Sequence, residues 1–448
     1  MGQGNLLIDS GLRDSVRLLA TLRIFLPLLV APLNGHDSRP PPQPADWLPT
    51  VSQLLLTILA VLAFALWLPN FVDLAALTKM VLRRGRDVRV SGPNDRLPRL
   101  LFLVPAHNEE QLIMHCVRSL VSMDYPHESR RIVVIADNST DGTARLAREA
   151  GAECVERFDE AHRGKPHAIA WALRLLGLSQ MEACVIIDAD TVVASDFARG
   201  LAALAPLEGI AVQANVGTMN EWDNWLTRLE GLLGRCRYEV TYSIRDGARL
   251  NCPLTGNGMC LGRDLLEPNG WQAFSLTENW ELYARYTAEG VRVRYAHDAK
   301  LFMQIVRSMS QGQTQRSRWL AGRTWVLRTW WRKIFGSAKT GPLEKFAALT
   351  ELSALSPVLQ LSAAIVVALL AFLLSGRSRF WIAGMALTSI ASLVVATSIV
   401  LVRHPHPRDT LLAFLRLPMY AIWRASVAAA TLFLPNSGEW LKTERHSV

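Results

Sequence analysis

The sequence predicts an α/β domain with membrane-spanning helices on both sides, and three observations support this class. Long uncharged runs near both ends of the 448-residue chain are long enough to cross a bilayer. Between them, short apolar runs alternate with helical patterns, as they do in a mainly parallel sheet covered by helices. One apolar run ends in two acids, Asp188 and Asp190, at the kind of strand end where open α/β sheets bind ligands.

The composition is that of a membrane protein with a polar middle. Half of the residues are hydrophobic, and the formal net charge is +9. The basic residues gather beside the uncharged runs, which indicates contact with anionic lipid headgroups and argues against nucleic acid as a partner. The cysteines are scattered and form no C-x-x-C pair. We therefore expect reduced thiols, as in a domain exposed to the cytosol.

Residues 1–90 are predicted to form an N-terminal membrane region. The first apolar segment, residues 18–33, fits a short span, an interfacial helix or the apolar part of an uncleaved signal. A Pro-rich linker follows at residues 39–44, and the uncharged residues 47–72 predict a full span. Basic residues come soon after it: Lys79, Arg83, Arg84, Arg86 and Arg89. By the positive-inside rule they place the next domain in the cytoplasm.

Residues 91–314 are predicted to form the α/β domain. Apolar runs predict strands at residues 100–104, 131–136, 183–188 and 210–216. Helical patterns lie between these runs, at residues 110–122, 143–150 and 167–176. This alternation predicts a mainly parallel sheet.

Residues 315–345 are predicted to form an amphipathic helical region at the membrane interface. On a helical wheel, one side holds Trp319, Val326, Leu327, Trp330 and Ile334, and the other holds Arg318, Arg328 and Arg332. Trp325 falls on the basic side, so the amphipathic pattern is imperfect.

Residues 346–448 are predicted to form a C-terminal membrane region. The uncharged residues 352–376 and 380–402 predict two spans. Residues 411–435 are less apolar, and they fit either a third span or a re-entrant or interfacial segment.

Charges make the last segment ambiguous. It contains Arg416, Pro418 and Arg424. If it crosses the membrane, Lys442 and Arg445 would lie on the outer side, against the positive-inside rule.

Asp188 and Asp190 are the clearest candidate site. In an extended segment they point to the same side, because side chains alternate with a period of two. Two carboxylates on one side repel each other unless a cation or hydrogen-bond donors lie between them. Mg²⁺ or Mn²⁺ bridging to substrate phosphates would fit this position. Taken alone, the stretch fits two solvated acids at a strand end equally well.

Two more strand ends run into small and polar residues and then into helices. Residues 105–110 follow the first strand, and residues 136–143 follow the second. Asp137 could accept hydrogen bonds from a base or a ribose, whereas Asp141 or Thr143 could cap the next helix. Capped loops of this sort are common, so neither motif alone decides between a ligand site and a helix cap.

Four later motifs are also ambiguous when each is taken alone. Lys165 could place a positive charge near a nucleotide or could be solvated. The glycines of residues 255–258 allow the backbone to approach a ligand closely. The acids of residues 277–281 could act chemically or could complement a helix dipole. The Arg and Trp of residues 315–319 could bind a ligand or anchor the helix to lipid headgroups.

Taken together and in this order, the motifs resemble those of the membrane-integrated family 2 glycosyltransferases. They read P-A-x-N-E, D-x-S-x-D-G-T, G-K, D-A-D, T-E-x and Q-x-x-R-W along the chain. The family includes cellulose, hyaluronan, chitin and poly-N-acetylglucosamine synthases and ceramide glucosyltransferases. The resemblance covers residues 97–335. It implies a GT-A fold, which is a Rossmann-like mixed sheet, and inverting transfer from a nucleotide sugar.

The resemblance also implies a role for individual residues on the nucleotide side. His107 follows Ala106 where the family usually has a Tyr beside the uracil. The other residues implied to lie around the nucleotide are Glu109, Asp137, Lys165 and Asp188. Asp190 is implied to bind the metal, Mg²⁺ or Mn²⁺.

On the acceptor side, one position departs from the family pattern. The resemblance implies that Arg318 approaches the diphosphate and that Gln315 and Trp319 border the acceptor sugar. The family motif T-E-D supplies an Asp as general base, but this chain has Asn279, whose carboxamide cannot take a proton.

Three interpretations of Asn279 remain open. Glu278 could act as the base in a shifted geometry, with Glu281 as a further substitute. The chain could be a variant with little transfer activity. Alternatively, the acceptor could be acidic enough to need no strong base. A second departure is His297, where the family often has Pro; we expect a loop histidine there rather than a metal ligand.

These observations predict an inverting glycosyltransferase at the cytoplasmic face of the cell (inner) membrane. The expected partners are a UDP-sugar donor, a growing polysaccharide or a lipid acceptor, membrane lipids and the accessory subunits that many synthases need. The protein is expected to be a multi-pass membrane protein. The alternative is a catalytically weak or non-catalytic membrane subunit that keeps the nucleotide-binding fold, because Asn279 replaces the expected base.

Overall fold

The computed structural model describes residues 44–83, 97–267, 269–374 and 376–433. Several features named above lie outside the described residues: the segment at residues 18–33, most of the Pro-rich linker, part of the basic cluster after the first span, Lys442 and Arg445. The chain divides into two units, residues 1–54 and 55–448. The sheet and all but one of the described helices lie wholly in the second unit.

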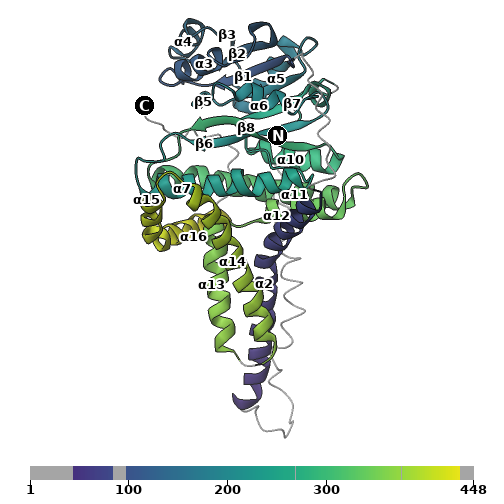
Figure 1. Ribbon diagram of the computed structural model, residues 1–448, viewed down its shortest axis with the longest axis vertical. Helices are drawn as coiled ribbons and strands as arrows, with labels where there is room; N and C mark the ends of the chain where they lie inside the picture. Colours follow the sequence, from purple (N-terminus) through teal and green to yellow (C-terminus); the bar gives the residue numbers. More distant parts are fainter. Residues whose placement is uncertain (1–43, 84–96, 268, 375, 434–448) are drawn as a thin grey trace, which may run out of the picture. The chain divides into compact units, whose positions relative to one another are not determined.

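An eight-stranded mixed sheet forms the centre of the described α/β domain (Figure 1). Its strands are β1 (Leu100–Ala106), β2 (Arg130–Asp137), β3 (Glu153–Arg157), β4 (Ala183–Ile186), β5 (Thr191–Val193), β6 (Ala211–Thr218), β7 (Met259–Gly262) and β8 (Val293–Met303). They lie in the order β3-β2-β1-β4-β7-β6-β8-β5. The first four pair in parallel, β7 is antiparallel to both its neighbours, β6 and β8 are parallel, and β5 is antiparallel to β8. The four strands predicted from the sequence are confirmed as β1, β2, β4 and β6.

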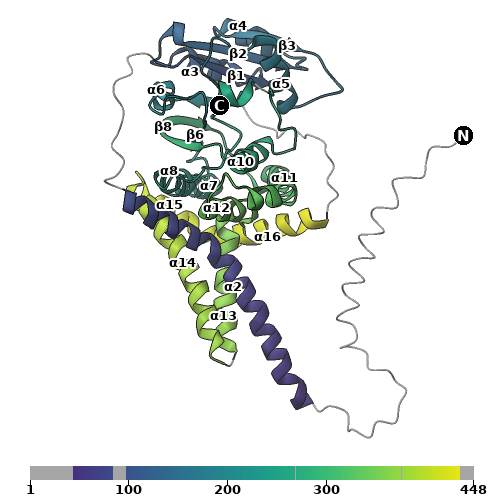
Figure 2. The same cartoon turned by 90° about the vertical axis from the view of Figure 1, so that its right-hand side faces the viewer.

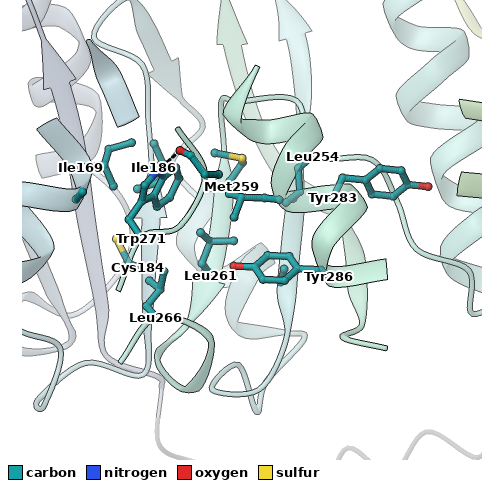
Figure 3. Close-up of a cluster of buried hydrophobic side chains, with 14 of the residues drawn as sticks. Ile169, Cys184, Ile186, Leu254, Met259, Leu261, Leu266, Trp271, Tyr283 and Tyr286 are labelled. Atoms are coloured by element: carbon teal, nitrogen blue, oxygen red, sulfur yellow. Dashed lines mark hydrogen bonds between the residues drawn. The ribbon is translucent and has the colours of Figure 1, made fainter. Parts of the chain in front are cut away.

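Helices cover both faces of the sheet because its central strands are apolar on both sides. Alternate residues of β1 face opposite layers. Leu101 and Leu103 pack with α5 (Lys165–Leu176) and α10 (Glu278–Glu289), and part of this layer is drawn in Figure 3. Phe102 and Val104 pack with α3, α4 and α6. Those three helices are Ile113–Val121, Thr143–Glu149 and Phe197–Ala202.

All but one of the remaining elements of the domain follow β6. They are α7 (Trp225–Arg235), the π-helix η3 (Cys236–Tyr242), α8 (Ser243–Gly247), α9 (Arg263–Leu266) and α11 (Met309–Gly336), and a short 3₁₀ turn, η2 (His127–Ser129), precedes β2. On α11, Val326 and Ile334 are buried in the same layer as α10. Trp319 and Trp325 are exposed. The apolar side of this helix therefore packs largely within the chain, and its place at the membrane interface stays a prediction.

The apolar helices lie at the two ends of the sequence. They are α2 (Pro44–Arg83), α12 (Pro342–Ser353), α13 (Pro357–Leu373), α14 (Ser378–Arg403), α15 (Pro407–Ala413), the 3₁₀ turn η4 (Phe414–Arg416) and α16 (Leu417–Phe433). Among the described residues, three helices are long and apolar enough to cross a membrane: Gln53–Arg83, Ser378–Arg403 and Pro407–Thr431. Many of their large apolar side chains are exposed, as expected for contact with lipid.

The predicted span at residues 352–376 is broken in the structure. It begins at the end of α12, and α12 and α13 meet at an angle of 92°. Pro357 explains the break, because proline lacks the N–H of a helical hydrogen bond and disfavours helical geometry at Ser356 before it. In Figure 2, α16 (yellow) runs across α13 and α14 rather than along them.

Helices α2, α13 and α14 pack side by side (Figures 1 and 2), largely through alanines. Pro69 interrupts the hydrogen bonding of α2, and the carbonyl of Leu66 nearby accepts three side-chain hydrogen bonds. Asn70 Nδ2 donates at 2.9 Å, Gln360 Nε2 of α13 at 3.0 Å and Ser389 Oγ of α14 at 3.3 Å. Polar side chains therefore connect these three helices within an apolar environment.

Candidate active site

The carboxyl ends of β1, β2 and β4 lie at one edge of the sheet, because the three strands are adjacent and parallel. This arrangement brings together the predicted nucleotide-side residues that follow them. His107, directly after Ala106, places its Nδ1 2.8 Å from the carbonyl oxygen of Asp137. The backbone N–H of Glu109 donates to Thr143 Oγ1 at 2.8 Å. The two loops predicted after the first and second strands are thus hydrogen-bonded to each other.

Asp137 lies in a buried ion pair. Arg157, opposite it at the end of β3, donates from Nη1 to Asp137 Oδ1 at 2.6 Å, and both side chains are buried. The Asn138 amide donates to the same oxygen at 3.2 Å. Sequence reasoning missed Arg157, because β3 was not recognised and a charged residue at its end looked like surface. One carboxylate oxygen of Asp137, Oδ1, is therefore already bound to Arg157 before any ligand is present.

Lys165 connects three of the predicted motifs. It lies at the start of α5, after Gly164, and its Nζ donates to Asp188 Oδ1 and to the carbonyl oxygen of Gly256, both at 2.6 Å. The same Nζ lies 3.8 Å from Glu278 Oε1. Gly256 has φ +92°, which favours glycine and turns its carbonyl towards Lys165. Taken alone, Lys165 could have been a solvated side chain; the structure instead pairs it with an acid.

Asn257 fixes the turn that carries Asp188 and Asp190. It is 3% exposed, its Oδ1 accepts from the backbone N–H of Asp188 at 3.2 Å, and its Nδ2 donates to Thr191 Oγ1 at 2.7 Å. Asp190 is 7% exposed, and Thr191 Oγ1 lies 3.3 Å from Asp190 Oδ1. The sequence marked only the glycines of this loop, but the side chain of the asparagine between them holds the turn at Asp188 and Thr191.

The donor set of this edge suits a metal that also binds the substrate. Within the described residues, no group of three His, Cys, Asp or Glu side chains is placed to hold an ion. Mg²⁺ needs no such cage, since it is commonly bound by one or two carboxylates together with waters and substrate phosphates. Asp190 fits that pattern, whereas Lys165 already neutralises one oxygen of Asp188.

Glu278 and Asn279 start α10 and face different partners. The Asn279 amide donates to the carbonyl oxygen of Leu254 at 2.8 Å. Glu278 is 8% exposed and lies beside Lys165. Burial raises the pKa of the Glu278 carboxyl, while the charges of Lys165 and Arg318 act in the opposite direction. Of the two, only Glu278 carries an ionisable group in this cluster.

Glu281, the further substitute considered above, has a structural contact. Its Oε2 accepts from the backbone N–H of Ser275 at 3.0 Å. This bond holds the segment before α10 and makes Glu281 a poorer candidate for a base.

Helix α11 brings Arg318 to the acids of the site. Helix α11 packs closely against the start of α10 at Gly322, because a Cβ added at Gly322 would be only 2.5 Å from Thr277 Oγ1. Burial lowers the pKa of the Arg318 guanidinium, and the carboxylates of Glu278 and Asp188 oppose that shift. Two further predicted residues lie on the same helix: Gln315 is buried and Trp319 is 39% exposed. The guanidinium of the neighbouring Arg316 lies 4.7 Å from the centre of the Trp319 ring.

The expectation of a loop histidine at His297 is wrong. His297 lies within β8, where the register with β6 shifts between Ala214 and Asn215. Its Nδ1 lies 3.0 Å from Asp298 Oδ1, and both side chains are exposed. The two polar residues interrupt the apolar pattern because they occupy this irregular stretch of the strand.

A family model for glycosyltransferase like family 2 matches residues 98–322. The chain belongs to this family. It is 29% identical over 197 residues to the β-monoglucosyldiacylglycerol synthase of Nostoc sp., which covers 42% of the chain and 41% of that protein. It is 24% identical over 248 residues to the probable glycosyltransferase YdaM of Bacillus subtilis, covering 53% of the chain and 58% of that protein. The alignments thus span less than two thirds of either relative.

Two further comparisons are with a third curated glycosyltransferase and with a solved structure. The family 2 chain is 34% identical over 92 residues to the 4,4'-diaponeurosporenoate glycosyltransferase of Staphylococcus aureus, covering 20% of the chain and 24% of that protein. Its fold matches the mannosyltransferase PcManGT from Pyrobaculum calidifontis, solved with GDP-Man and Mn²⁺, with a TM-score of 0.53 and 20% identity. That match covers 84% of this chain and 99% of the other, and it supports the GT-A fold.

Proposed function

We propose that this family 2 glycosyltransferase moves a sugar from a UDP-sugar to a lipid acceptor at the cytoplasmic membrane face, with inversion at the anomeric carbon. The observation that carries the proposal is the group of Lys165, Asp188 and Glu278, with Arg318 beside it. Two of the relatives are named β-monoglucosyldiacylglycerol synthase and 4,4'-diaponeurosporenoate glycosyltransferase, and these names favour a lipid over a polysaccharide as the acceptor.

The donor side of the site stabilises the leaving diphosphate. When the glycosyl bond breaks, negative charge builds on UDP, and preorganised positive charge lowers the energy of that state. Arg318 supplies a fixed guanidinium, which can bind two phosphate oxygens at once. Asp190 would hold Mg²⁺ or Mn²⁺, which supplies further charge stabilisation when bound. Asp188 and Asp137 would orient the nucleoside through hydrogen bonds.

Glu278 is the proposed general base. The acceptor hydroxyl attacks the anomeric carbon opposite the leaving UDP, and its proton passes to the Glu278 carboxylate. Burial gives this carboxylate a higher proton affinity than an exposed glutamate has. Asn279 has no such basicity, and its amide is already donating to Leu254.

A panel of UDP-sugars tests the proposal. Full-length protein in detergent is incubated with each donor, Mn²⁺ and a lipid extract, and released UDP and lipid products are measured. One labelled glycolipid band supports the proposal. Long, polydisperse material would instead identify a polysaccharide synthase, the acceptor class that the sequence left open.

Asn279 supports a second candidate, a membrane subunit that binds nucleotide without transferring sugar. UDP-sugar binding without release of UDP from any donor in the panel would favour that candidate and contradict transfer. Because binding and turnover are measured on the same preparation, misfolded protein is recognised by the loss of both.

A further inference from the structure

One face of α11 packs against the apolar helix α16. Gly312, Arg316 and Trp319 follow one another at spacings of four and three residues, so they lie on the same side of α11. Helix α16 meets this side at Gly312, where an added Cβ would lie only 3.1 Å from the Trp423 ring. The same helix α11 packs on the start of α10 at Gly322. Helix α11 therefore contacts both α16 and the active site.

Three direct contacts lead from α16 to the Trp319 ring. The Tyr420 hydroxyl of α16 donates to Glu230 Oε1 of α7 at 2.6 Å. Arg316 Nη2 lies 2.8 Å from the same oxygen. The guanidinium of Arg316 in turn lies over the Trp319 ring, 4.7 Å from its centre. These four residues are called the Tyr420 network below.

Most of the Tyr420 network is shielded from water. Tyr420 is buried, and the side chains of Arg316 and Glu230 are only 13% and 12% exposed. Apolar residues of α7, α13 and α15 pack in one cluster with Tyr420: Leu226, Leu229, Val358 and Ala413. Hydrogen bonds and ion pairs are stronger in such surroundings because little water competes for the same groups. The network therefore restricts the position of the Arg316 guanidinium.

Trp319 is the exposed end of the network. A guanidinium is attracted to the face of an indole ring, so Arg316 restricts the orientation of this ring. The preceding residue, Arg318, is the one proposed above to bind the diphosphate. An indole has an apolar body and one N–H donor, which suits an acceptor that carries both apolar and polar groups.

We propose that Tyr420 is a positioning residue for the lipid acceptor, and that it acts through Glu230 and Arg316 on the orientation of the Trp319 ring. This inference rests on the proposed function, because it concerns how the acceptor of that reaction is bound. It goes further by giving α16 a part in acceptor binding. Removing one hydroxyl from α16 should therefore weaken acceptor binding, although Tyr420 itself contacts neither substrate.

The test is a double-mutant cycle in the full-length protein in detergent, with dioleoylglycerol as acceptor and UDP-glucose as donor. Tyr420→Phe should raise the KM for dioleoylglycerol by roughly 3- to 10-fold, because a hydrogen bond to a charged group is lost. The KM for UDP-glucose should stay the same. In the Trp319→Ala background, Tyr420→Phe should have no further effect on the acceptor KM, because the ring through which it acts is absent.

Tyr125→Phe is the matched control. It also removes one tyrosine hydroxyl, which donates to the Pro98 carbonyl oxygen at 2.6 Å in the layer on the other face of the sheet. The cost in packing is therefore similar, but both KM values should stay at the wild-type level. If UDP-glucose and dioleoylglycerol give no product, the most active donor and lipid of the panel above replace them.

Three outcomes would overturn the inference: an equal acceptor KM in Tyr420→Phe and the wild type, an equal rise in Tyr125→Phe, or an additive loss in the double variant with Trp319→Ala. If the melting temperature shows that Tyr420→Phe does not fold, Glu230→Gln replaces it. This variant loses the negative charge that holds Arg316 and should raise the acceptor KM in the same way.

The two proposals fail in different ways. If the wild type binds UDP-sugars but releases UDP from none of them, the proposed function fails and this inference fails with it. If the wild type is active and Tyr420→Phe leaves the acceptor KM unchanged, only this inference fails.

Discussion

Glu278 and Asn279 are neighbours in sequence with different roles in the structure. The carboxyl group of Glu278 lies in a charged cluster with Lys165 and Asp188. The Asn279 amide instead holds the backbone at Leu254. This difference supports Glu278 as base among the three interpretations that the sequence left open, and it can be tested one residue at a time.

Replacing Glu278 by Gln should abolish sugar transfer while UDP-sugar binding persists. The amide keeps the size of the side chain but cannot accept a proton. Loss of a general base typically costs about 10²–10⁴-fold in rate. Turnover and donor affinity are measured on the same protein. Glu281→Gln is the matched control and should keep its activity; unchanged turnover in Glu278→Gln would remove the assignment.

Asn279→Asp should lower stability and bring no large gain in turnover. A carboxylate cannot donate to the Leu254 carbonyl oxygen and would repel it. Losing this partly buried bond costs on the order of 1–3 kcal/mol. Thermal unfolding and UDP release are compared with the wild type. A large rise in turnover would show that Asn279 is a lost base.

The pH dependence of transfer should follow the titration of Glu278. Burial raises the pKa of this carboxyl, so it keeps its proton to a higher pH than an exposed glutamate does. Turnover should therefore be lost below that pKa and rise as the pH increases through it. The positive charge of Lys165 lowers the pKa of Glu278, and Lys165→Gln removes this charge. In this variant the rise in turnover with pH should therefore shift to higher pH. If turnover rises at the same pH in Lys165→Gln as in the wild type, a group other than Glu278 would control the pH dependence.

At the scale of elements, the long apolar runs were predictable and the short or irregular strands were not. β1, β2, β4 and β6 follow directly from apolar runs in the sequence. β5 and β7 have only three and four residues, which is too short for a pattern. β8 is long, but His297 and Asp298 interrupt its alternation where the register shifts. These segments form strands because they pair with strands that are distant in the sequence, and a local sequence pattern does not reveal such pairing.

The candidate site was predictable at its motifs but not at the residues that hold them in place. The ordered motifs located Lys165, Asp188 and Glu278, which the structure brings together. Arg157 and Asn257 were missed, because each acts through a partner that is distant in sequence. Buried polar residues of this kind resemble ordinary surface residues until the fold is known.

Position 322, where α11 packs against α10, should not accept a residue larger than glycine. A Cβ there would collide with Thr277, so Gly322→Ala must push the helices apart and displace Arg318 from the acids. Overpacking of this kind costs about 1–3 kcal/mol. Gly234→Ala in α7 is the control, because its Cβ would meet no atom within 4 Å. UDP release and melting temperature should fall in the first variant only; equal behaviour of both would contradict the close packing.

At the scale of the whole molecule, hydrogen bonds to the Leu66 carbonyl should stabilise the packing of α2 with α13 and α14. Gln360→Leu and Ser389→Ala each remove one donor. Side-chain hydrogen bonds between membrane helices average about 0.6 kcal/mol, so each variant should melt slightly earlier. Because both donors share one acceptor oxygen, the double variant should melt earliest, but its loss should differ from the sum of the single losses. Ser362→Ala is the control, since its hydroxyl donates to the carbonyl oxygen of Val358 in its own helix. A double variant as stable as the control would contradict this role.

The partners of Leu66 also constrain the order in which the protein is made. Gln360 and Ser389 follow it by 294 and 323 residues. At roughly 5–20 residues per second, a ribosome needs about 15–60 s to reach them. During that time, of the three side-chain donors to this carbonyl, only Asn70 has been synthesised, while the residues of the α/β domain are still being added to the chain. Synthesis therefore completes the sheet first, and the three-helix contact closes only after α14 has been made.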